Sequence, residues 1–137
     1  MAIMKKALSL LLLTIPPLAL ADFCEEAKEA GYDAIRNVVA FTDREIGIAG
    51  HKPNWYREYD CISDEENAEV IFESLMLNST LAGQLYGLKG LLNSNQTIYE
   101  RYVAKYKDNN TEVTTVFGCV VGRMRVGEVV KDLLGSD

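Results

Sequence analysis

The N-terminal half of the chain shows helical spacing of apolar residues, followed by a stretch without a period. Between residues 23 and 41 the apolar side chains recur at steps of three and four, which predicts an amphipathic helix with Asp22 as its N-cap. Residues 42–61 show no sustained period and mix glycine, proline, aromatic and charged residues. This stretch is predicted to be a long loop. A loop of this length in a small domain either carries function or contains secondary structure that the pattern does not reveal.

Three further helices are predicted from the middle of the chain. Ser63-Asp64-Glu65-Glu66 has the pattern of a capping box and predicts a helix that runs to about residue 78. The next helix is expected over about 80–92, where a leucine stripe lies beside alanine and glycine residues that would let another helix approach closely. A third helix is expected over about 97–106. Because only short polar turns separate these segments, neighbouring helices are expected to form hairpins.

The C-terminal part of the chain fits two secondary structures. Residues 112–125 have apolar side chains at helical spacing, yet they are rich in valine and threonine, which favours strands. We expect a short hairpin around Gly122, and then a helix over about 127–134 that ends at Gly135. The predicted fold is therefore mainly α, a small domain of four to five helices with helical hairpins and one disulfide. The sequence does not decide whether a short β-hairpin lies near the C-terminus.

The segment before Asp22 has the features of a secretory signal peptide. Two lysines precede an apolar run, and Ala19-Leu20-Ala21 supplies the small residues of a cleavage site. Residues 1–21 are therefore predicted to be removed, leaving 22–137 as a single periplasmic or secreted domain without a lipid or membrane anchor. The formal net charge of the chain is -6, and loss of the two leader lysines makes it -8.

This acidic balance limits the classes of partner. Nucleic acid and an anionic membrane surface both require a basic face, so neither is expected as the main partner. A basic protein surface would be attracted instead. The chain holds one histidine and three cysteines, without the spacing of a metal site, so no metal or cofactor is predicted.

The cysteines are expected to supply one disulfide, because in an oxidising compartment two of the three should pair. Cys61 with Cys119 is the favoured pair, since the two residues flank the central helices. Cys24 with Cys61 is the alternative. The thiol that is left over is expected to be buried or to link two copies in a homodimer.

The sequence offers little for catalysis. A dyad of His51 with a cysteine would need a catalytic signature that none of the three cysteines has around it. A glycosidase would need one carboxylate in an apolar pocket, whereas most acidic residues fall on outer helix faces. The protein is therefore not expected to be an enzyme. The alternatives are a small extracytoplasmic hydrolase that uses His51 or an acidic pair, and a structural or assembly factor of the envelope.

The predicted loop contains the residue types that dominate protein-binding sites, namely tryptophan, tyrosine and arginine. The candidate binding residues are Asp43, Arg44, Glu45, His51, Trp55, Tyr56, Arg57 and Tyr59. The alternative is that Trp55 and Tyr59 fold back onto the core as a small apolar cluster.

One resemblance supports a binding role. The segment from Ser79 to Leu91, followed later by Phe117-Gly118-Cys119, resembles a pattern in small secreted bacterial proteins. In overall type the chain is similar to the periplasmic immunity proteins of type VI secretion systems, which are short, exported, often helical, and occlude the active site of a toxin such as a peptidoglycan amidase. The resemblance implies a toxin inhibitor whose partner is a basic toxin or an envelope enzyme, and it assigns no functional residue.

Overall fold

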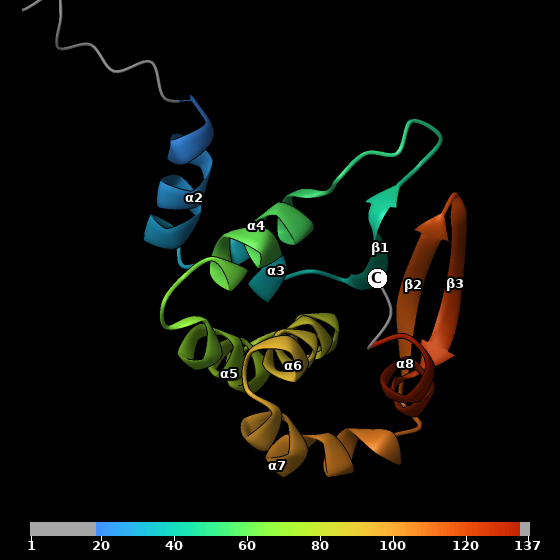
Figure 1. Ribbon diagram of the computed structural model, residues 1–137. Helices are drawn as coiled ribbons and strands as arrows, with labels where there is room; N and C mark the ends of the chain where they lie inside the picture. The colour runs from blue at the N-terminus through green and yellow to red at the C-terminus, as the bar shows by residue number, and fades with distance from the viewer. Residues whose placement is uncertain (1–18, 135–137) are drawn as a thin grey trace, which may run out of the picture.

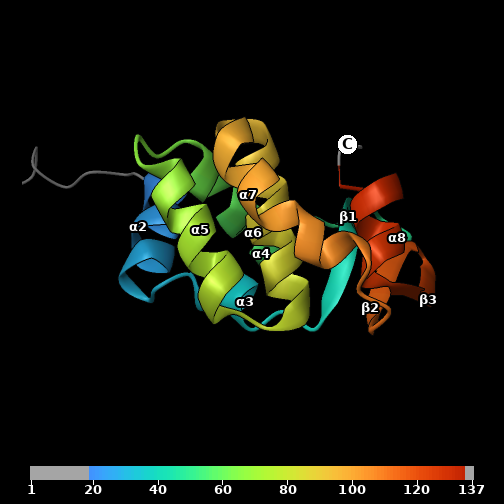
Figure 2. The same cartoon turned by 90° about the horizontal axis from the view of Figure 1, so that it is seen from below.

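The computed structural model describes residues 19–134, and these form seven helices and a three-stranded mixed sheet. In chain order the elements are α2 (Ala19–Glu29), α3 (Asp33–Arg36), β1 (Ala40–Ile46), α4 (Asn54–Ser63), α5 (Ala68–Asn78), α6 (Leu81–Ser94), α7 (Gln96–Lys107), β2 (Glu112–Gly118), β3 (Val120–Arg125) and α8 (Val126–Asp132). The prediction of a mainly helical domain of four to five helices is therefore wrong. Helices α2 to α6 gather on one side of the molecule and the β2–β3 hairpin lies on the other (Figures 1 and 2).

The helix predicted over 23–41 is broken in its middle. Helix α2 ends at Glu29, and the next turn contains Gly31 with φ 71° and Tyr32 with φ 56°. Two successive residues in the left-handed region cannot continue a right-handed helix. The short α3 follows, and the chain then becomes extended, so one apolar periodicity spans two helices and the start of a strand.

The sheet includes one strand that the sequence pattern did not predict. Strand β1 pairs parallel with β2, beginning with Ala40 opposite Thr114. Together β1 and α4 occupy most of the stretch 42–61, so the prediction of a long loop there is wrong. Strands β2 and β3 form the expected hairpin, but they turn at Gly118 and Cys119 and not at Gly122.

Helix α6 lies at the centre of the fold and contacts α3, α4, α5, α7, β1 and β2. Its N-cap Thr80 accepts a hydrogen bond from the amide of Gly83 at 3.2 Å, which confirms the predicted start. The predicted close approach of another helix is also confirmed. A Cβ atom at Gly87 would lie 2.7 Å from the carbonyl oxygen of Phe72 and from the amide nitrogen of Met76, so the backbone of α5 fills the space that a side chain would need.

The predicted helix cap at Ser63 is placed differently in the structure. Ser63 belongs to the last turn of α4, where its hydroxyl donates to the carbonyl of Tyr59 at 3.0 Å, and α5 begins only at Ala68. The capping box at Ser63 is therefore wrong. Helix α7 is capped by Asn95, whose Oδ1 accepts the amide of Ile98 at 3.1 Å.

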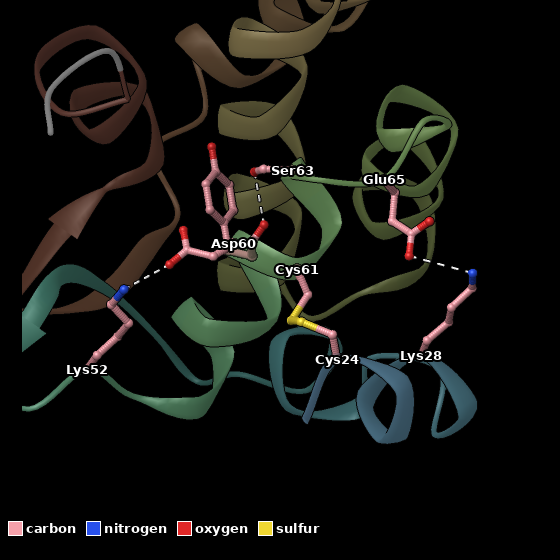
Figure 3. The surroundings of a disulfide bond; sticks show 8 residues. Cys24, Lys28, Lys52, Asp60, Cys61, Ser63 and Glu65 are labelled. Carbon is pink, nitrogen blue, oxygen red and sulfur yellow. Dashed lines mark hydrogen bonds and ion pairs between the residues drawn. A yellow bond between two sulfur atoms is a disulfide. The ribbon is translucent and has the colours of Figure 1, made fainter. Parts of the chain in front are cut away.

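The disulfide joins Cys24 of α2 to Cys61 of α4 (Figure 3). The favoured pairing of Cys61 with Cys119 is therefore wrong, because Cys119 is exposed at the β2–β3 turn, on the side of the molecule away from α2 (Figure 1). An ion pair of 3.5 Å between Lys28 and Glu65 lies near the disulfide. A structural disulfide indicates an oxidising, extracytoplasmic location.

The predicted leader falls almost wholly outside the described residues. Residues 1–18 lie beyond them, and the predicted cleavage point after Ala21 falls within the first turns of α2. None of the helices in the described part of the chain has the length and apolar character needed to span a bilayer.

Candidate protein-binding surface

The aromatic residues of the predicted binding loop pack mainly into the core. Tyr56 and Tyr59 are 3% and 4% exposed, and their ring centroids lie 5.6 and 6.3 Å from that of Tyr86 on α6. Trp55 is half-buried, and its indole Nε1 donates to Thr42 Oγ1 of β1 at 3.1 Å. These side chains therefore attach α4 to the rest of the fold, which is the alternative interpretation of this segment.

The basic residues of the same segment also make contacts within the chain. Arg44 Nη1 donates to both carboxylate oxygens of Asp60, at 2.8 and 3.0 Å, and Lys52 Nζ reaches the same carboxylate at 2.9 Å (Figure 3). The guanidinium of Arg57 lies 3.8 Å from the centroid of the Phe23 ring, a cation–π contact between α4 and α2. These ion pairs and this cation–π contact join β1, α2 and the segment before α4 to helix α4.

The other three candidate residues are exposed. Asp43 accepts the amide of Gly118 at 3.1 Å, and the backbone of His51 pairs with that of Ile46 in both directions at 2.8 Å. Glu45 is exposed on β1. The structure therefore does not bring the eight predicted residues together as one accessible surface, since two are buried and three others hold elements together.

Two buried titratable groups have structural partners. Glu58 is 6% exposed, and its Oε1 accepts the amide of Ile35 at 2.9 Å at the start of α3. Burial raises the pKa of Glu58, and hydrogen bonds from the amides of Ile35 and Ala34 partly oppose this shift. Burial likewise raises the pKa of Tyr86 to about 12, so its hydroxyl stays protonated while it accepts the amide of Thr42 at 2.9 Å.

A small cavity lies between β1 and α6. It has a volume of about 80 Å³, and its lining includes Arg44, Tyr56, Lys89 and Phe117. Lys89 is 2% exposed, and its Nζ donates to the carbonyl of Leu134 at 3.2 Å. The cavity has room for a few waters but is well below the roughly 300–1,000 Å³ of a typical ligand site. Among residues 19–134, no cluster of three His, Cys, Asp or Glu side chains could hold a metal.

An exposed apolar pair lies instead on the outer face of α5. Val70 and Leu77 are 60% and 58% exposed. Their spacing of seven residues puts them on the same face of the helix, two turns apart. The sequence contains a sign of this exposed pair, because Val70 and Leu77 are apolar residues that lie seven positions apart and outside the stripe that α5 buries. Helix α5 lies on the side of the molecule away from the β2–β3 hairpin (Figure 2).

The sequence around this pair is acidic. Between Arg57 and Lys89 the chain contains no lysine or arginine. The acidic residues in that stretch are Glu58, Asp60, Asp64, Glu65, Glu66, Glu69 and Glu73. Glu69 accepts a hydrogen bond from Asn95 Nδ2, and Glu73 Oε2 accepts the hydroxyl of Tyr102 at 2.7 Å. Helix α7 and its cap therefore hold two of these carboxylates in place beside the exposed face.

Comparison with protein-family models, curated proteins and solved structures finds no match to this chain. The geometry of the surface therefore carries the functional argument.

Proposed function

We propose that this protein is an exported binding protein of the immunity type. It neutralises a secreted antibacterial toxin, such as a cell-wall amidase, by covering the active site of that toxin in the periplasm. The leader predicted over residues 1–21 directs it there. The observation that carries the proposal is the exposed pair Val70 and Leu77 on an α5 face bordered by carboxylates.

The composition of this face matches the anatomy of protein interfaces. A typical interface has an apolar centre that loses its water on binding, and charged residues at its rim. Here Val70 and Leu77 supply the centre, and Glu66, Glu69 and Glu73 lie on or beside the same helix. Negative charge at the rim attracts a basic partner and increases its association rate. The proposed toxin surface is therefore basic around an apolar depression.

The test uses the toxin candidate encoded next to the gene for this protein. Both proteins are directed to the periplasm of a bacterial host, and survival is compared with and without the inhibitor. The purified pair is then titrated by calorimetry at several salt concentrations. We expect protection of the host, a one-to-one complex, and an affinity that falls as salt screens the charges.

Substitutions on α5 make the test specific. Leu77→Ala together with Val70→Ala should weaken binding about tenfold or more, the usual cost of truncating central interface residues. Ile48→Ala is the matched control, because Ile48 is 99% exposed but lies in the turn after β1. Equal affinity of the α5 variant and the wild-type protein would refute the α5 surface, and failure of the candidate to bind at all would refute that toxin as the partner.

A further inference from the structure

Strand β3 is an open edge of the sheet. The strand order is β1-β2-β3, so β2 has a neighbour on each side, whereas β3 pairs with β2 alone among the described residues. In both views β3 forms the outer margin of the molecule (Figures 1 and 2). The backbone amide and carbonyl groups that point away from β2 are therefore available to another strand.

This edge has few of the features that usually prevent pairing. Natural edge strands are protected by proline, by bulges, by charged side chains and above all lysine, or by a covering element. From Val120 to Arg125 the chain has no proline or lysine, and its charged side chains are Arg123 and Arg125. Its pairing with β2 runs without a register shift from Phe117 opposite Val120 to Glu112 opposite Arg125. Val120 and Val121 are 70% and 69% exposed, so the strand also offers apolar side chains on both of its faces.

The charges on the edge favour a neutral occupant. Arg123 Nε lies 3.9 Å from Glu112 Oε2, and Arg125 Nε lies 4.0 Å from Glu128 Oε1. Each arginine thus has an acidic neighbour in its own chain, and the edge has no excess charge to select a strongly acidic or basic segment. The acidic stretch around α5 lies on the side away from β3 (Figures 1 and 2), so two copies can meet at β3 while their acidic faces stay apart.

We propose that β3 pairs antiparallel with β3 of a second copy about a twofold axis at Gly122, which joins the two sheets into one. Opposite residues in this register have the same side-chain face, as a continuous sheet requires. Val120 lies opposite Met124 of the second copy, and Val121 lies opposite Arg123, whose aliphatic stem covers it. A register centred on Arg123 would place the two arginines directly opposite each other, which is unfavourable.

The register separates this dimer from a disulfide-linked one. Cys119 immediately precedes β3 and is exposed, but in the proposed pairing it lies opposite Arg125 of the second copy and not opposite its counterpart. The dimer therefore does not depend on the third thiol. It also leaves the α5 face of each copy free, so the dimer and the proposed function can fail independently.

The first experiment measures molar mass by light scattering over a range of protein concentrations, with and without reductant. We expect a dimer that persists in reductant and in Cys119→Ser. Val121→Asp should give a monomer with an unchanged circular dichroism spectrum, while Val70→Asp, at a similarly exposed site on α5, should stay dimeric. A monomeric wild-type protein, a dimeric Val121→Asp variant, or a dimer lost in Cys119→Ser would each overturn the proposal.

A cysteine introduced at the axis tests the register. A Cβ atom at Gly122 would meet only Thr115 Oγ1, at 3.5 Å, so the position has room for a side chain. Residues opposite each other in an antiparallel pair have Cα atoms about 4.5–5.5 Å apart, which is within the range for a disulfide. In a Cys119→Ser background, Gly122→Cys should crosslink fully on oxidation, and Arg125→Cys should not. The reverse result would overturn the register.

Discussion

Removing the disulfide should greatly destabilise the domain. Cys24 and Cys61 are 37 residues apart in the sequence, and closing a loop of that length removes chain entropy from the unfolded state. The loop-entropy relation gives about 4 kcal/mol at 25 °C. A domain of this size has a total stability of about 5–15 kcal/mol, so the double variant Cys24→Ala with Cys61→Ala should be marginally folded.

Urea unfolding followed by circular dichroism measures this loss. With a slope of about 2 kcal/mol per molar urea, the midpoint should fall by about 2 M. Cys119→Ser is the matched control and should change the stability by less than about 0.5 kcal/mol, because Cys119 is exposed. An unchanged midpoint in the double variant would refute the entropic argument. A bridge from Cys61 to Cys119, found by mass spectrometry of the unreduced protein, would refute the pairing.

Two further predictions concern buried contacts of α6 and α4. Gly87→Ala should lower the stability by about 1–3 kcal/mol in thermal unfolding, because the clash of its Cβ atom with the backbone of Phe72 and Met76 outweighs the gain of about 1 kcal/mol in helix propensity. Glu58→Gln should become more stable relative to the wild-type protein as the pH rises above 4.5. Because the pKa of Glu58 is raised in the folded state, the protonated carboxyl stabilises the wild-type protein below the unfolded-state pKa. This stabilisation is lost as the pH rises through the folded-state pKa, whereas glutamine does not titrate.

The Gly87→Ala and Glu58→Gln variants each have a matched control at an exposed position. Ser74→Ala, at an exposed position of α5, should change the stability by less than about 0.5 kcal/mol. A Gly87→Ala variant that is as stable as the wild-type protein would show that α5 can move away without cost. Glu66→Gln removes an exposed carboxylate and is the control for Glu58. A stability difference for Glu58→Gln that is independent of pH, or that falls as the pH rises, would contradict the buried-carboxylate argument.

The interactions that the sequence pattern predicted correctly are local. The leucine stripe, the cap at Thr80 and the small residues of α6 are all visible within about fifteen residues, since helix propagation depends on neighbours three and four positions apart. The β2–β3 hairpin is also local. The sequence also contains the information needed to find the exposed pair on α5, because Val70 and Leu77 are apolar, lie seven residues apart and fall outside the buried stripe.

The tertiary structure alone decided the features that rely on distant partners. Strand β1 exists because Ala40 pairs with Thr114 across the whole helical middle of the chain, and strand formation depends on such neighbours more than on intrinsic preference. The left-handed turn at Tyr32, the choice of Cys24 as the partner of Cys61, and the burial of Tyr56 and Tyr59 follow from how α2, α4 and α6 pack. Composition and periodicity thus determined the acidity of the chain and the helices in its middle, whereas packing determined the mixed sheet and which of the aromatic and charged residues face the solvent.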